Sequence, residues 1–97
     1  MFDTKLDRHQ LLAIVITGTG LAHFAMPSQF DPINRQLGFL TNTRRHVYLN
    51  GGIETAIGVL SARQATRKAA LGVGLAYSTY LTGHAVRFRL TARKASA

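Results

Sequence analysis

The sequence predicts an all-α integral membrane protein, a helical bundle with three transmembrane helices and a short interfacial helix after the first. Three apolar runs of helical length lack the charged face that each helix of a soluble bundle would turn to water. The net charge of +8 comes from twelve Lys and Arg against four acids, and the basic residues flank these runs instead of entering them. Such flanking is typical of chains that cross a bilayer, so we expect a single membrane domain over residues 1–97.

The composition also excludes several kinds of chemistry. The chain has no cysteine, so disulfides, thiolate metal sites and thiol catalysis by this chain are excluded. It contains no nucleophile triad, phosphate-binding glycine loop or metal-ligand spacing. A nucleic-acid-binding helix would carry a basic stripe along its length, and no such stripe is present. We therefore expect no nucleic-acid partner, and a soluble basic helical domain that binds nucleic acid is only the third alternative.

The first transmembrane helix is expected over about residues 5–26. Thr4 and Asp7 have the spacing of a capping box ahead of the apolar run 11–26. That run corresponds to about 24 Å of helix, so the polar first turns must supply the rest of a ~30 Å hydrocarbon core. The alternative is a secretory signal peptide, in which Lys5 and Arg8 would form the charged region.

A short interfacial helix is expected next, over about residues 32–40. Pro27 should end the first helix, and Asp31 followed by Pro32 has the form of an N-cap with proline at the first helical position. Ile33 and Leu37 lie at helical spacing and would face the apolar side of a membrane surface. The alternative is an amphipathic connector packed on its own bundle.

The second and third transmembrane helices are expected over residues 46–62 and 69–88, with a basic turn between them. The basic tail, residues 89–97, is expected to fray after Leu90. Both helices carry small residues at helical spacing, which allows close contacts between helices in a membrane. The expected helix-packing residues are Gly51, Thr55, Gly58, Ala70, Gly74 and Ser78.

Glu54 is the only glutamate and lies in the middle of the second run. Because a charge facing lipid would cost at least ~3 kcal/mol, its carboxyl group is expected to face other helices. Antiparallel crossings would place Glu54 level with Thr19 and Tyr80, with His23 and His84 nearer one surface. The expected cluster therefore contains the candidate cofactor-binding residues His23, Glu54, Tyr80 and His84, and no catalytic or metal-ligating residue is expected.

This polar cluster has two interpretations. The simpler one is a hydrogen bond between helices, in which Glu54 pairs with a Thr, Tyr or His and no cofactor is required. The other is a quinone or haem site, because two histidines on parallel helices at similar depth can ligate haem and a Glu beside a His can relay protons to a quinone.

Four groups of residues carry a resemblance to a known family. They are Gly20, Leu21, Ala22, His23 and Phe24; Pro27 and Phe30; Val47, Tyr48, Leu49, Gly51, Glu54 and Gly58; and Thr66, Arg67, Ala69 and Ala70. In these residues the chain resembles the DoxX-like family of small bacterial membrane proteins. The resemblance implies a four-helix membrane bundle, and related proteins are membrane subunits in thiosulfate-to-quinone electron transfer or associate with other oxidoreductases. A fourth helix would be missing here or supplied by a partner.

The sequence therefore predicts a multi-pass protein of the cell inner membrane. We expect an accessory or scaffold subunit of a larger membrane complex, such as a respiratory or other oxidoreductase complex, without catalysis of its own. Its expected partners are the lipid bilayer and other membrane-protein subunits or further copies of the chain. The alternative function is that of a quinone- or haem-binding electron-transfer subunit.

Overall fold

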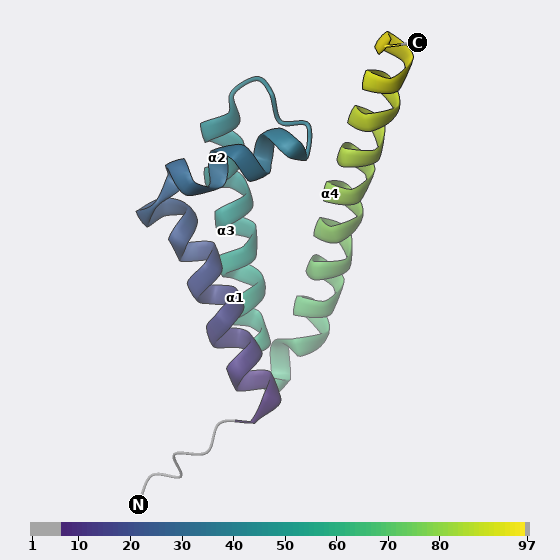
Figure 1. The fold of residues 1–97 in the computed structure, drawn as a ribbon. Coiled ribbons are helices and arrows are strands. Elements are labelled where there is room, and N and C mark those ends of the chain that lie inside the picture. Colours follow the sequence, from purple (N-terminus) through teal and green to yellow (C-terminus); the bar gives the residue numbers. More distant parts are fainter. Residues whose placement is uncertain (1–6, 97) are drawn as a thin grey trace, which may run out of the picture.

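The computed structural model describes residues 7–96, and the regular elements in this range are all helices (Figure 1). In chain order they are α1 (Arg8–Ala25), α2 (Pro27–Gln36), α3 (Thr43–Ser61), the short 3-10 turn η1 (Gln64–Thr66) and α4 (Arg67–Ser96). The all-α class predicted from the apolar runs is therefore confirmed.

Helices α1 and α3 form an antiparallel pair, and α2 lies across one end of it (Figure 1). Helix α4 begins at the opposite end, follows α3 back, and extends past α2 with its last turns (Figure 1). The molecule is accordingly elongated, with extents of 64 × 26 × 18 Å.

The first helix begins later than expected, at Arg8. Asp7 caps it, because its Oδ1 accepts from the backbone N–H of Gln10 at 2.8 Å and its own N–H donates to Gln10 Oε1 at 3.2 Å. The capping box is thus made by Asp7 and Gln10. The predicted partner Thr4 and the predicted first turn from residue 5 lie outside the described residues.

The break between α1 and α2 falls at Met26, where the two helix axes bend by 103°. Pro27 opens α2 at its first position, where the missing N–H of proline costs nothing. The prediction that Asp31 caps a helix over 32–40 is wrong, because Asp31 and Pro32 lie inside α2. Helix α2 ends before Gly38, whose φ of +96° is a conformation that favours glycine.

The other boundaries also differ from those expected. Helix α3 covers residues 43–61 instead of 46–62, and α4 covers 67–96 instead of 69–88. The tail expected to fray is helical as far as Ser96. After Gly83 the chain contains neither Gly nor Pro, and its commonest residues are Ala and Arg, which favour helix.

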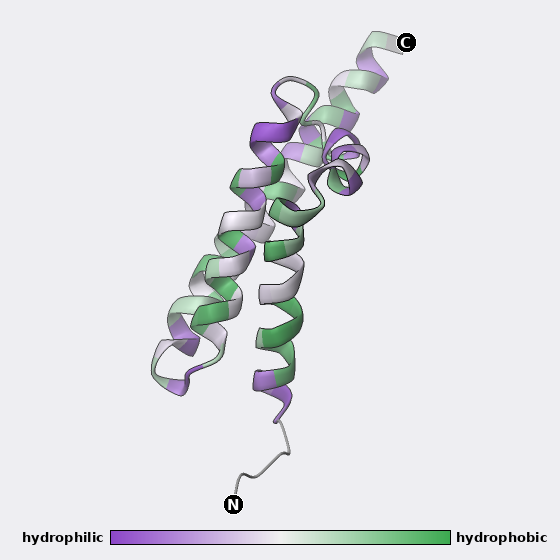
Figure 2. Cartoon of the chain, turned by 90° about the vertical axis from the view of Figure 1, so that its left-hand side faces the viewer, coloured by the Kyte–Doolittle hydropathy of each residue, from purple (hydrophilic) through white to green (hydrophobic). Residues whose placement is uncertain are grey.

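Few large apolar side chains are buried in this fold. In the part of the chain that the structure describes, the buried hydrophobic residues are Ala13, Phe39, Val47, Ile57 and Ala70. Many others on α1, α3 and α4 remain exposed, including Leu11, Ile14, Val15, Leu21, Leu49, Val59, Val73 and Val86. Figure 2 shows the hydrophobic residues of α1 and α3 mainly in the middle of the molecule, with hydrophilic residues toward the ends.

By length and apolar character, none of the helices within residues 7–96 could cross a membrane by itself. Helices α1 and α2 taken together meet these requirements, but the pair is bent by 103° at Met26. The three transmembrane helices therefore remain a prediction.

Candidate functional site

The contact between α1 and α3 is made by small residues. A Cβ atom on Gly20 would overlap the backbone and hydroxyl of Thr55, and one on Gly58 would overlap the backbone of Thr17. Gly51 lies in the same way against the side chain of His23. The two helix backbones can therefore approach closely, as at small-residue contacts between membrane helices.

This close contact brings His23 of α1 and Glu54 of α3 together. His23 Nε2 lies 3.1 Å from Glu54 Oε2, and the other ring nitrogen, Nδ1, lies 2.8 Å from the backbone oxygen of Thr19. The imidazole also stacks on Phe30 of α2, with ring centroids 3.8 Å apart. Contacts with α1, α2 and α3 thus surround the His23 ring, and only 5% of the residue is exposed.

The proton positions in this pair follow from its partners. A carbonyl oxygen can only accept, so His23 Nδ1 carries a hydrogen that it donates to Thr19. The contact between His23 Nε2 and Glu54 Oε2 then holds one proton, either on the imidazole as an ion pair or on the carboxyl group as a neutral pair. The His23–Glu54 pair can thus hold a proton between two helices.

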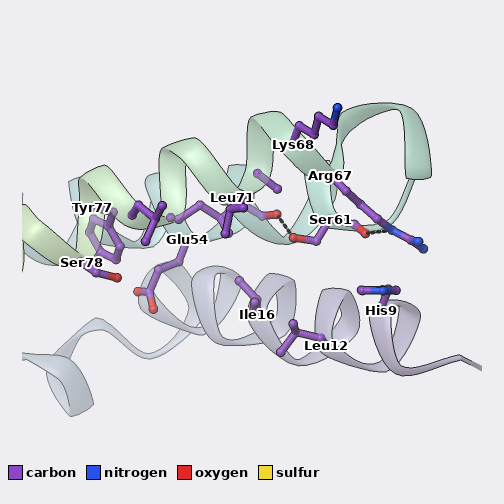
Figure 3. Close-up of a pocket in the computed structure, with 14 residues that line it drawn as sticks. His9, Leu12, Ile16, Glu54, Ser61, Arg67, Lys68, Leu71, Tyr77 and Ser78 are labelled. Carbon is purple, nitrogen blue, oxygen red and sulfur yellow. Dashed lines mark hydrogen bonds between the residues drawn. The ribbon is translucent and has the colours of Figure 1, made fainter.

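Glu54 also faces a groove between the α1–α3 pair and α4. The groove has a volume of about 670 Å³ and is lined mainly by apolar side chains, among them Leu12, Ile16, Ile57, Leu71 and Leu75. Tyr77 and Ser78 of α4 lie beside Glu54 at one end of the groove (Figure 3). Glu54 therefore connects the buried His23 to the wall of an open groove.

Tyr80 and His84 belong to a different cluster from His23 and Glu54. The structure stacks His84 on Phe39, with ring centroids 4.2 Å apart, and places Tyr80 at 5.9 Å from the same ring. His46 stacks against Phe39 as well, with centroids 4.5 Å apart. His84 Nδ1 is 2.9 Å from the backbone oxygen of Leu37. The expected single polar cluster is thus divided into two sites, and the Phe39 cluster attaches α4 to the loop before α3.

Sequence reasoning missed Tyr77 and Phe39. Tyr77 precedes Tyr80 by less than one helical turn, so the expected depth of Glu54 did not distinguish between them. Phe39 lies in an irregular segment, where no helical period marks a buried residue. Its only signal was the presence of a large aromatic residue between two polar stretches.

The six expected helix-packing residues also separate into two groups. Gly51, Thr55 and Gly58 lie at the α1–α3 contact. Ala70, Gly74 and Ser78 line the groove, where Ala70 is buried and a Cβ atom on Gly74 would meet no other atom within 4 Å. At Gly74, α4 therefore leaves space beside the helix.

The arrangement of the histidines does not match haem ligation. Both ring nitrogens of His23 have partners, and His84 lies in the Phe39 cluster with Nδ1 at the oxygen of Leu37. Within the described range, no three His, Asp or Glu side chains are grouped so that they could hold a metal ion. A quinone differs from haem in needing only an apolar space and a hydrogen-bonding group, and the groove beside Glu54 has both.

Comparisons with protein-family models, with curated proteins and with solved structures found no match. The resemblance to the DoxX-like family therefore remains a prediction.

Proposed function

We propose that this chain is a small multi-pass protein of the cell inner membrane that acts as an accessory or scaffold subunit of a larger membrane complex. The observation that carries the proposal is the distribution of apolar and polar side chains. Large apolar side chains face outward from α1, α3 and α4, whereas the contact between α1 and α3 contains glycines and the His23–Glu54 pair. Lipid or the helices of other subunits would cover such an exterior.

The helix lengths support the same proposal. Helix α1 has 18 residues and α3 has 19, which correspond to about 27 and 28 Å of helix. These lengths approach the ~30 Å hydrocarbon core, and a mismatch of a few ångströms is accommodated by local thinning of the bilayer. The apolar part of α4 ends before Arg87 and Arg89. Helices α1 and α3, with their polar first turns included, are thus about as long as one crossing.

The charged residues support this placement because they gather at the two ends of the bundle. Arg44 and Arg45 lie at the start of α3, at the end covered by α2, and Arg63, Arg67 and Lys68 lie at the turn between α3 and α4. Arg44 also pairs with Asp31 of α2 at 2.8 Å. Helix α2 would then lie along one membrane surface, fixed by this ion pair to the end of α3.

The His23–Glu54 pair has a structural role in this proposal. It joins α1 to α3 by a buried polar contact near the end of the bundle that α2 covers. The DoxX-like resemblance favours a complex with an oxidoreductase, and the chain itself would contribute binding surface.

An electron-transfer subunit that binds a quinone is the second candidate. It is favoured by one observation, namely that Glu54 touches both His23 and the apolar groove. A quinone ring in the groove could then exchange a proton with the pair. In an intact complex that contains Glu54→Gln, the scaffold proposal predicts unchanged quinone-linked turnover, whereas the quinone proposal predicts its loss.

The membrane proposal is tested by washing membranes of cells that produce the protein with high salt and then with alkaline buffer. We expect the protein to stay in the pellet and to need detergent for extraction, because apolar contact is insensitive to salt. Release by salt would favour the soluble basic domain that binds nucleic acid. Affinity purification from the detergent extract, followed by mass spectrometry, would identify the partner subunits.

A further inference from the structure

The two ends of the groove differ in charge. His9, Arg67 and Lys68 lie at one end, and Glu54, Tyr77 and Ser78 lie at the other (Figure 3). Apolar side chains line the space between these ends. The groove therefore fits a ligand with an anionic group at one end and an apolar body.

The basic end is built from residues whose positions are partly fixed. The Arg67 Nε–H points to the backbone oxygen of Ser61 at 3.4 Å, which directs the guanidinium toward His9 (Figure 3). Asp7 is the nearby acid, and its Oδ2 lies 4.0 Å from Arg67 Nη2, a distance at which the ion pair is weak. Among the described residues, this weak pair with Arg67 is the acidic contact at the basic end, so Arg67 and Lys68 leave positive charge for a ligand.

The dimensions of the groove fit a lipid chain. From Arg67 to Ser78 along α4 is about 16 Å, and from Ser61 to Glu54 along α3 is about 10 Å. The volume of about 670 Å³ lies within the ~300–1,000 Å³ range of small-molecule sites. In a membrane, the basic end would lie at the level of the phosphates of one leaflet, beside the turn between α3 and α4.

We propose that this groove binds an anionic phospholipid, with its phosphate at Arg67, Lys68 and His9 and one acyl chain along α4. An arginine fork and a nearby lysine are the groups that bind phosphate in proteins. The Glu54 carboxyl group would repel a second anionic head group at the far end, so the lipid has one orientation. This inference rests on the proposed membrane location.

The test uses the full chain purified in a non-ionic detergent, with phosphatidylglycerol or phosphatidylcholine of identical acyl chains added. Native mass spectrometry would count the bound lipid. We expect phosphatidylglycerol to be retained in preference to phosphatidylcholine. In the double variant Arg67→Gln, Lys68→Gln its affinity should fall about tenfold or more, since each basic residue near the phosphate contributes about 1 kcal/mol. The control variant Arg87→Gln, Lys94→Gln removes the same charge elsewhere on α4 and should retain the lipid.

A second pair of variants tests the groove itself. Gly74→Leu would place a side chain in the groove without a clash at Cβ, whereas Gly72→Leu would place one at a position that does not line the groove. We expect loss of phosphatidylglycerol only in Gly74→Leu, with unchanged helicity in both. If Gly74→Leu does not fold, the charge variants decide.

Equal retention of the two lipids, or unchanged retention in the charge variant, would overturn the proposal. So would a photocrosslinker at Leu71 that captures a helix of another protein in place of lipid. Failure of the lipid proposal is distinguishable from failure of the membrane proposal. A protein that stays in washed membranes but shows no lipid preference contradicts the lipid proposal alone. A protein released by salt contradicts the membrane proposal.

Discussion

Replacing Glu54 by leucine should weaken the contact between α1 and α3, whereas replacing it by glutamine should leave the contact nearly intact. The carboxyl group is the partner of His23 Nε2 at 3.1 Å, and the His23 side chain is only 6% exposed. Leucine would leave this ring nitrogen buried and unpaired, at a cost of about 1–3 kcal/mol. The added apolar burial offsets roughly 1 kcal/mol of that cost, so the expected net loss is about 1–2 kcal/mol.

Glutamine preserves the contact of Glu54 with His23. Since His23 Nδ1 donates to Thr19, neutral His23 can accept at Nε2 from the glutamine amide. We therefore expect a loss of less than about 0.5 kcal/mol for Glu54→Gln.

The assay is unfolding of the purified protein by SDS in mixed micelles, followed by far-UV circular dichroism. Thr79→Leu is the control, because the Thr79 hydroxyl is exposed and bonds only within α4, to the oxygen of Leu75 at 2.8 Å. An unchanged free energy of unfolding in Glu54→Leu would refute the role of the pair. Equal losses in the leucine and glutamine variants would instead show that a full ion pair is required.

Three further predictions concern other contacts. Gly58→Ala should destabilise the protein by about 1–3 kcal/mol because its Cβ would overlap the backbone of α1, whereas Gly72→Ala, with open space around it, should stabilise the protein by about 0.5–1 kcal/mol. Similar changes in the free energy of unfolding for both variants would argue against the close contact. The Arg44 guanidinium holds the pKa of the Asp31 carboxyl group below its ordinary value of 3.8, so the ion pair stabilises the fold above pH 3.8 and is lost as the pH falls through the lowered pKa. NMR titration should show the lowered pKa of Asp31 and its return toward the ordinary value in Arg44→Gln. Equal pKa values of Asp31 in the two proteins would contradict the ion pair. Phe39→Ala should free α4 from the loop before α3, since the Phe39 ring is only 2% exposed and packs between them. Spin labels on α2 and α4 should then give a broader distance distribution, and an unchanged narrow distribution would show that other contacts hold α4.

The helical class and the α1–α3 contact could be predicted because both depend on local periodicity. Gly51, Thr55 and Gly58 share one face of a helix at spacings of three and four, whatever the helix packs against. Glu54, the one acid in the second apolar run, was expected to face another helix, and its carboxyl group contacts His23 of α1. These inferences needed only the pitch of a helix and the cost of exposing a charge to lipid.

The partners across the helices could not be predicted in the same way. Glu54 was expected in one cluster with His23, Tyr80 and His84, and it contacts His23, whereas Tyr80 and His84 lie at Phe39. Depth alone leaves an uncertainty of about one turn, or 5.4 Å, which does not distinguish Tyr80 from Tyr77. The position of His84 depended on the bend at Met26 and on the loop around Phe39, and neither has a periodic pattern. Two prolines could each have started the second helix, and α2 begins at Pro27 instead of at Pro32, as had been expected.

The central claim, that the apolar exteriors of the helices lie in lipid, is tested most directly by single-cysteine labelling, which the cysteine-free chain permits without background. Cysteine would replace Val15 and Val73, which are 62% and 38% exposed and lie outside the groove, and Arg45 and Gln64, which lie near the ends of the bundle. In membrane fragments open on both sides, a water-soluble maleimide should label positions 45 and 64 and leave positions 15 and 73 unlabelled until detergent is added. Rapid labelling of positions 15 and 73 without detergent would contradict the membrane account.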